Sequence, residues 1–364
     1  MRLLVVRHHR DNPAAWAREL GISREAVELY LASDVLDLHL DSFIWCRLLG
    51  YDLRRRHEPG PTRGRFLSQV DFPRVREGAL GGGIWSITTN PWRRSGRRPE
   101  RLVENLRRLQ GIFASVPDDF AVVRNAAEYR RARDAGRHAA FLGIQGGNAL
   151  DRDLDALDLI PDDLILRITL VHLTNSRIGV TSAPTGAWWG RGKRGLGLSD
   201  FGRDYVRRLN EKRILVDLAH INRSGFFDAV EVHDPALPLI VTHTGVVGVT
   251  PHWRNLDDEQ LRAVAESGGT VGVMYQTSFL GEPFFGGRAE GVVRHLAHIV
   301  RTVGEDFASL GSDWDGAINP PRDLRSPLDL PRLVEAMLRR RFSPERIQKI
   351  LGGNFLRVVG ALRG

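Results

Sequence analysis

The sequence predicts an α/β protein of the (β/α)8, TIM-like barrel class. Eight short apolar runs alternate with amphipathic helical patterns along the 364 residues. Most of these runs are continuously apolar rather than strictly alternating, which is typical of a parallel sheet covered on both faces. Eight such units favour a closed barrel. A doubly wound open sheet is the alternative, but no Gly-x-Gly-x-x-Gly turn follows the first run to support dinucleotide binding.

The expected elements follow one another from residue 35 onward. We expect strands over 35–42, 79–88, 139–146, 165–172, 213–221, 238–244, 269–275 and 307–313. Helical patterns cover 68–78, 101–116, 125–137, 199–212, 222–232, 256–267 and 289–303, and helices near 327–341 and 344–351 close the chain. Gly81-Gly82-Gly83 lies inside the second strand, where it indicates close packing or a bulge.

Residues 1–34 are expected to form an N-terminal helical extension. Ser23 is placed as the N-cap of a helix that begins Arg-Glu-Ala-Val. After this extension the sequence contains no long linker, low-complexity tract or short repeat that would divide it. Residues 35–364 are therefore predicted to be one barrel domain.

Composition excludes several classes of protein. A hydrophobic content of 42% fits a globular chain with a large core. No apolar run is long enough to span a bilayer, and the apolar start is too short for a signal peptide. The single cysteine, Cys46, rules out an intramolecular disulfide and a cysteine-rich zinc site. We expect a cytoplasmic protein with no membrane partner.

The formal net charge of +8 does not indicate nucleic-acid binding. The basic excess is almost entirely arginine, and it is spread through helices that also carry Asp and Glu. The longest basic clusters, at 54–56 and 92–98, are not accompanied by an aromatic-interleaved motif. We therefore expect no nucleic-acid partner.

The stretch Val35–Asp41 contains the first candidate site residues. Side chains alternate along a strand, so Asp37, His39 and Asp41 share one face and the leucines between them take the other. Polar groups on one face of a buried strand are costly unless they are paired, and a cation is the simplest partner. An isolated His-x-Asp is more simply explained as a satisfied core histidine.

Similar strand ends recur along the chain. Each later candidate ends a strand, and the set is Gln145, His172, His220, His243, Asp313 and Asp315. Singly, such a histidine can bond a neighbouring backbone and such an aspartate can cap the next helix. Asp217, inside its strand, is expected to hold a histidine tautomer. Together, four of the twelve histidines at strand ends with carboxylates and no thiolate indicate zinc or a similar divalent cation, open to water.

These motifs resemble a known family. The segments Asp37-Leu-His-Leu-Asp41, Thr169-Leu-Val-His172, Val216-Asp-Leu-Ala-His220 and Gly311-Ser-Asp-Trp-Asp-Gly316 occur in the order found in the amidohydrolase superfamily. More closely, the chain resembles the renal (membrane) dipeptidase family from about Asp37 to its C-terminus.

The resemblance implies a two-metal hydrolase. His39 and Asp41 match the ligands of one zinc ion, and His220 and His243 match those of the second. Asp313 matches the catalytic aspartate that handles the proton of the metal-bound water. His172 matches a catalytic histidine that contacts the scissile carbonyl, and Arg254 matches the arginine that binds the substrate's terminal carboxylate.

One position departs from the family pattern. The residue that would bridge the two metals is Gln145, where the family carries glutamate. An amide is neutral and offers one oxygen donor, whereas a carboxylate offers two anionic oxygens. We therefore expect one or two zinc ions, with weaker loading of the second site.

The leading interpretation is a zinc-dependent dipeptidase that hydrolyses small dipeptides through a metal-activated water. One alternative is a related amidohydrolase that acts on another small amide or lactone with one metal. The other is a catalytically silent homologue that acts as a binding or scaffold protein. The family resemblance also suggests a homodimer.

Overall fold

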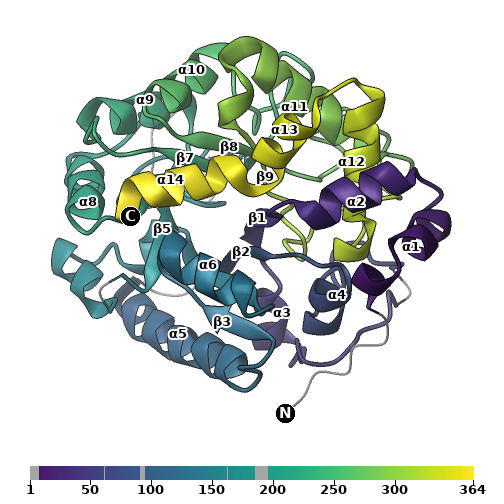
Figure 1. Ribbon diagram of the computed structural model, residues 1–364. Helices are drawn as coiled ribbons and strands as arrows, with labels where there is room; N and C mark the ends of the chain where they lie inside the picture. The colour runs from purple at the N-terminus through teal and green to yellow at the C-terminus, as the bar shows by residue number, and fades with distance from the viewer. Residues whose placement is uncertain (1–7, 61, 91–94, 162, 185–195) are drawn as a thin grey trace.

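Parallel strands form the centre of the molecule. The computed structural model describes residues 8–60, 62–90, 95–161, 163–184 and 196–364 (Figure 1). Its strands pair in the order β1-β2-β4-β5-β6-β7-β8-β9, all in parallel, and β3 pairs with β4 outside this path. Asp41 N donates to Trp314 O at 3.0 Å and Asp313 N to His39 O at 3.1 Å. These bonds join the two ends of the path, so the predicted (β/α)8 barrel is confirmed.

The strands are short, as is usual for a barrel. Their bounds are β1 (Leu36–Leu40), β2 (Gly82–Thr88), β3 (Phe120–Val122), β4 (His138–Gln145), β5 (Ile165–Thr169), β6 (Leu215–Asp217), β7 (Ile240–Thr244), β8 (Thr270–Val273) and β9 (Ala308–Leu310). All eight expected strands are present, seven within their predicted ranges and β4 beginning one residue before its predicted start at 139. The three-residue β3 was not predicted, because so short a run carries no periodicity.

Helices surround the strands. Their bounds are α1 (Pro13–Leu20), α2 (Arg24–Ala32), α3 (Phe43–Leu48), α4 (Phe72–Glu77), α5 (Arg98–Ala114), α6 (Ala126–Asp134), α8 (Asp200–Glu211), α9 (Arg223–Val232), α10 (Asp258–Glu266), α11 (Ala289–Val303), α12 (Leu330–Arg339), α13 (Pro344–Gln348) and α14 (Asn354–Arg363). Side chains of Asn125, Ser199, Asn222 and Asp257 accept hydrogen bonds as N-caps and fix where the helices after β3, β5, β6 and β7 begin.

Some helix expectations were wrong. The helix expected over 68–78 begins only at Phe72, because Asp71 caps it and Pro73 occupies its first turn. The helix expected to end near 351 continues through a π-helical turn, η7 (Lys349–Gly353), into α14. Helices α1 and α3 were also missed. Residues 92–94 of the basic cluster at 92–98 lie outside the described residues.

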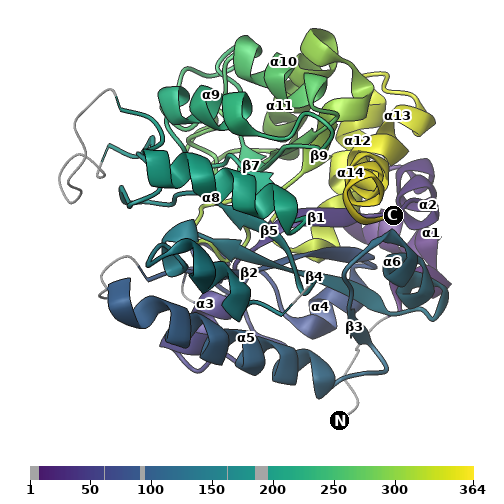
Figure 2. The same cartoon turned by 90° about the vertical axis from the view of Figure 1, so that its left-hand side faces the viewer.

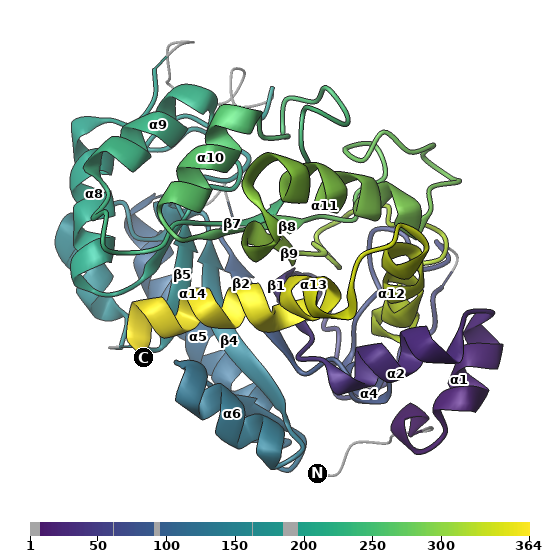
Figure 3. The same cartoon turned by 45° about the horizontal axis from the view of Figure 1, so that its top comes forward.

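The N-terminal helices pack on the barrel. Ser23 caps α2 as expected, since its hydroxyl accepts from Ala26 N at 3.2 Å and donates to Glu335 of α12 at 2.5 Å. Helices α2 and α12 lie side by side in Figure 3. Trp16 and Tyr30 are buried. The division at residue 34 stays a prediction.

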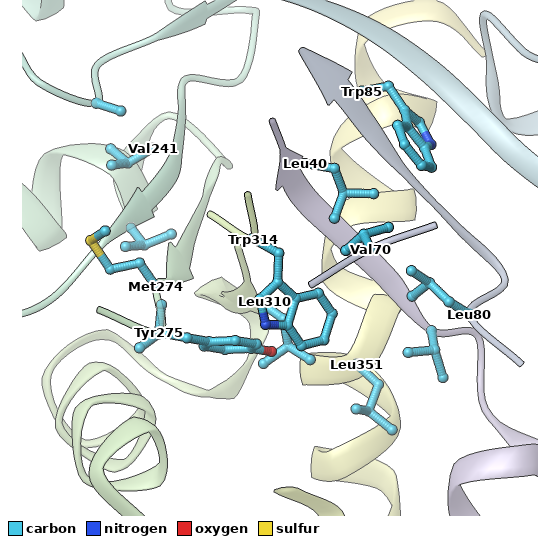
Figure 4. Packing of buried hydrophobic residues seen from close by; sticks show 14 of the residues in the cluster. Leu40, Val70, Leu80, Trp85, Val241, Met274, Tyr275, Leu310, Trp314 and Leu351 are labelled. Atoms are coloured by element: carbon cyan, nitrogen blue, oxygen red, sulfur yellow. The ribbon is translucent and has the colours of Figure 1, made fainter. Parts of the chain in front are cut away.

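Close approach of strands explains the glycine run in β2. A Cβ at Gly82 would lie 2.9 Å from Ala139 O, and one at Gly83 would lie 2.9 Å from Asp37 O. The predicted close packing is confirmed. Large side chains fill the spaces elsewhere: Trp314 and Tyr275 meet edge to face, with ring centroids 5.3 Å apart (Figure 4).

Helix α14 covers one end of the barrel (Figures 1 and 2). Phe355 contacts Phe141 of β4 at a centroid distance of 5.6 Å, and one apolar cluster joins both to Leu215 of β6 and Ile240 of β7. These residues lie toward the beginnings of their strands. The opposite end, where the strands finish, is the end at which (β/α)8 barrels carry their sites. In the described part of the chain, we find no helix long and apolar enough to cross a membrane.

Candidate active site

The predicted site residues meet at the carboxyl ends of the strands. The ring centroids of His39 in β1 and His243 in β7 are 3.9 Å apart, and those of His220 and His243 are 4.9 Å apart. His172, three residues after β5, lies 4.6 Å from His220 by the same measure. The structure thus brings together histidines from β1, β7 and the segments after β5 and β6.

Two site residues have strained backbones. His220 has φ 68° and Asp313 has φ 61°, in the left-handed region that non-glycine residues seldom adopt. Each stands where the chain leaves the barrel wall and turns. Such residues cost roughly 1–3 kcal/mol and cluster at functional sites.

His39, His243 and Asp313 form a candidate metal site. They are buried, and one ligand atom from each lies within 4.8 Å of the others. His39 Nε2 lies 3.6 Å from Asp41 Oδ1 and 3.6 Å from Asp313 Oδ1. Among the described residues this nitrogen has no hydrogen-bond partner. An unpartnered buried nitrogen facing two carboxylates fits a divalent cation only while it carries a lone pair.

A second convergence surrounds Gln145, the last residue of β4. Nε2 of His220 and Nε2 of His243 are 2.9 Å apart, and Gln145 Nε2 lies 3.3 Å and 3.4 Å from them. The Thr88 hydroxyl lies 2.6 Å from Asp41 Oδ1 and 2.9 Å from Gln145 Oε1. The amide therefore occupies the middle of the site without adding charge. The donor set fits one cation, held by His243 and Asp313 with either His39 or His220.

Asp217 supports the site indirectly. It was expected to hold a histidine tautomer, and it does so through a threonine: its carboxylate accepts from the hydroxyls of Thr169 at 2.5 Å and Thr242 at 2.7 Å. Thr242 Oγ1 in turn lies 2.9 Å from His243 Nδ1. Because the threonine hydroxyl is donated to Asp217, it accepts from His243 Nδ1–H. His243 Nε2 is then the nitrogen with a free lone pair, as a metal ligand requires.

Asp315 is a structural residue. Its carboxylate accepts from the Ser42 hydroxyl at 2.6 Å, Gln69 N at 2.9 Å and Val70 N at 3.1 Å. These bonds tie the chain after β9 to the segments after β1 and before α4. Both oxygens of its carboxylate accept bonds from these groups, so its contacts give it a structural role.

Burial sets the protonation of the site. It lowers the pKa of His39, and it lowers the pKa of His220 and His243 well below the ordinary value. Burial also lowers the pKa of His172 to about 4. Burial and the neighbouring Asp41 charge raise the pKa of Asp313 well above its usual range. The imidazoles are therefore neutral near pH 7, which is the form that binds metals.

A cavity of about 700 Å³ opens onto these residues. Its lining includes Asp41, His172, His220, Asp313 and Arg254. Arg254 is only 3% exposed and donates to His243 O at 2.6 Å. Its Nε has no partner among the described residues, and burial lowers its pKa to about 10, so it is charged at neutral pH. A buried cation with an unused donor is suited to a carboxylate.

Four more arginines line the same cavity: Arg47, Arg98, Arg101 and Arg108. Arg47 donates to Thr88 O at 2.8 Å, and Arg108 donates to Cys46 O at 2.7 Å. These bonds to carbonyls hold the guanidinium groups of Arg47 and Arg108 in place, whereas Arg101 pairs with Glu104 of the same helix. This wall makes the cavity electropositive.

Sequence reasoning missed one buried charge in the site. Arg167 of β5 is fully buried, and its Nη2 lies 2.6 Å from His39 Nδ1. The signal was present: Arg167 and Thr169 stand two residues apart in an otherwise apolar strand and so share the inward face.

The fold and the site define a class: a metal-dependent hydrolase on a (β/α)8 barrel. A family model described as "Membrane dipeptidase (Peptidase family M19)" matches residues 23–363, and the chain belongs to that family. It is therefore a metal-dependent dipeptidase, and the predicted family is confirmed.

Solved structures agree with this assignment. A dipeptidase described as a metallo peptidase of family M19 is 28% identical, with a TM-score of 0.79 over 90% of this chain and 98% of the other. A metallo peptidase from Rhodobacter sphaeroides, liganded with a phosphinate mimic of the dipeptide L-Ala-D-Ala, is 27% identical. Its TM-score is 0.76, and the match covers 90% of this chain and 98% of the other. A probable dipeptidase from Pseudomonas aeruginosa shares the fold at 17% identity. Its TM-score is 0.80, and the match covers 95% of this chain and 99% of the other.

Proposed function

We propose that this protein is a zinc-dependent dipeptidase that cleaves small dipeptides ending in a free carboxylate. The observation that carries the proposal is the pairing of two features in one cavity. A cluster of neutral histidines and buried aspartates lies beside Arg254, a buried guanidinium with an unused donor. The cavity volume of about 700 Å³ suits a small substrate.

The ligand set supports zinc. Imidazole and carboxylate donors are those zinc uses in catalytic sites, with a position left open to water. In this proposal His220 and His243 supply the imidazole donors, with Gln145 beside them. His39 and Asp41, the other predicted ligands, lie next to this pair. A bound divalent cation would make water acidic enough to act as a nucleophile near neutral pH.

The other residues have roles that follow from their contacts. Asp313, whose raised pKa lets it carry a proton, exchanges that proton between water and the leaving amine. His172 lines the cavity beside His220 and stabilises the developing oxyanion. Arg254 binds the terminal carboxylate of the substrate.

Gln145 favours a second candidate. A neutral residue between the histidines is consistent with a one-metal enzyme for another small amide or lactone, or with a catalytically silent homologue. Retention of Arg254 with an unused donor favours the dipeptide, since a lactone offers it no carboxylate. A cytoplasmic location and a homodimer stay predictions.

The proposal is tested by a hydrolysis panel on purified protein loaded with zinc. The panel contains dipeptides, the same dipeptides amidated at the C-terminus, and a set of lactones. We expect turnover of free dipeptides only. Turnover confined to lactones or amides would support the second candidate, and no turnover with zinc bound would support the silent homologue.

A further inference from the structure

Arg167 places a permanent positive charge beneath the candidate metal site. Its side chain is fully buried inside the barrel, and a Cβ at Gly143 would lie only 2.7 Å from Arg167 Nε. Glycine at that position leaves the space that the guanidinium occupies. Arg167 donates to Ile144 O at 3.0 Å, to Thr169 Oγ1 at 2.5 Å and to Ser86 Oγ at 2.5 Å, and it lies 3.4 Å from Asp217.

Its contact with His39 determines which imidazole nitrogen carries the proton. A guanidinium only donates, so Nδ1 of His39, 2.6 Å from Arg167 Nη2, must accept. A neutral imidazole has one acceptor nitrogen, and the proton of His39 therefore lies on Nε2. Nε2 is the nitrogen that faces Asp41 and Asp313, each at 3.6 Å. A protonated nitrogen cannot bind a metal.

The positive charge of Arg167 also lies close to the carboxylates whose negative charge would stabilise a second metal ion. Burial lowers the pKa of Arg167, and the charges of Asp217, Asp41 and Asp313 oppose this shift. A second dication would meet this fixed charge and a bridging residue, Gln145, that contributes none. Like charges in a buried site repel much more strongly than in water.

We propose that Arg167 takes the place of one metal ion, so that this centre binds a single divalent cation through His220 and His243. Arg167 is a positioning residue: it acts on the site through His39. The inference rests on the proposed metal-dependent function, but the number of bound ions can be measured without turnover. The alternative is that Arg167 only fills the barrel, in which case the number of ions depends on Gln145 alone.

The test is the number of zinc ions retained per chain after saturation and desalting, measured by elemental analysis. We expect one ion in the natural protein, one in Gln145→Glu, and two in the Gln145→Glu/Arg167→Met double variant. Gln145→Glu/Arg74→Met is the matched control. Arg74 is also buried but pairs with Asp71, and this control should retain one ion.

Two ions in the natural protein or in Gln145→Glu would overturn the proposal, as would one ion in a folded double variant. If the double variant does not fold, cobalt replaces zinc in the natural protein. Electron paramagnetic resonance should show a single uncoupled cobalt ion, and a coupled pair would overturn the proposal. One ion without dipeptide turnover would count against the proposed function alone. No bound ion in any variant would overturn both.

Discussion

Nε2 of His220 and Nε2 of His243 lie 2.9 Å apart, although His220 follows β6 and His243 belongs to β7. The Asp217–Thr242 chain places the proton of His243 on Nδ1, so its Nε2 points a lone pair at His220. Two neutral imidazoles at this distance are held either by an N–H···N hydrogen bond or by a cation bound to both nitrogens.

Removing the metal should abolish hydrolysis and lower stability. A ligand that binds only the folded state stabilises it by about 4 kcal/mol at a thousandfold excess over its Kd. Treatment with a chelator should therefore lower Tm by several degrees, and zinc should restore both Tm and turnover. Unchanged turnover in chelated, metal-free protein would contradict a metal-dependent mechanism.

Replacing Arg254 should impair recognition of the substrate carboxylate. Loss of a charge-assisted hydrogen bond costs roughly 1.5–3 kcal/mol, so kcat/KM of Arg254→Met should fall by roughly 10- to 150-fold for dipeptides. The C-terminally amidated dipeptide serves as the internal control, since it lacks the carboxylate and should lose little. An equal loss for both substrates would mean that Arg254 is needed for folding and not for recognition.

Asp313→Asn should lower kcat by roughly 10²- to 10⁴-fold, because an amide cannot exchange the proton. Asp315→Asn is the matched control, because Asp315 is two residues away and is also buried. It should lower the free energy of unfolding by about 1–3 kcal/mol through its lost bonds to Ser42 and Gln69, with little change in kcat. Equal effects of the two substitutions on kcat would refute the assigned role of Asp313.

The metal-free protein should lose stability in mild acid because of His138. Its Nδ1 donates to Leu80 O at 2.8 Å and its Nε2 accepts from Trp85 Nε1 at 3.1 Å. Burial lowers its pKa to about 3. The folded state thus keeps His138 neutral while the unfolded state, with a pKa of about 6.5, binds a proton as the pH falls. Stability is full above pH 6.5 and decreases toward pH 3.

Between pH 7 and pH 5 this histidine should account for a loss of about 2 kcal/mol in the free energy of unfolding. Urea denaturation in the presence of a chelator measures it. Between the same two pH values, the free energy of unfolding of His138→Gln should fall by about 2 kcal/mol less than that of the natural protein. His8→Gln, which changes an exposed histidine, provides the comparison. An identical pH slope in His138→Gln would show that the imidazole is not the group responsible.

The arginine wall should favour acidic dipeptides. Arg47, Arg98, Arg101 and Arg108 line the cavity and should raise the local concentration of anions. We expect kcat/KM to be higher for Asp- or Glu-containing dipeptides than for Lys-containing ones. The difference should shrink as salt is raised from 0.05 to about 0.5 M. A salt-independent ranking would point to shape rather than charge.

The sequence was sufficient to predict the barrel because its strands are buried on both faces and separated by capped helices. The eight expected strands lie where the apolar runs are. The elements that the sequence did not reveal are short or follow an irregular turn. Strand β3 pairs over only three residues, and α14 begins after a π-helical turn that interrupts the helical period.

The site was predictable to the extent that its residues end strands. His39, His172, His220, His243 and Asp313 all come together as expected. Arg167 was not found because an arginine inside a strand is usually assigned to an exposed edge, and only the structure shows that Gly143 leaves room for it. The indirect role of Asp217 depends on which hydroxyl lies between it and the histidine, which spacing alone does not encode.

Helix α14 has a consequence for how the chain is made. It supplies Phe355 and its neighbours to the core at the beginnings of the strands, yet residues 354–363 follow every strand in synthesis. A nascent chain that has completed β9 still exposes Phe141, Leu215 and Ile240 to water. These side chains can therefore be buried only after α14 has left the ribosome, and until then the growing chain exposes apolar surface that favours aggregation.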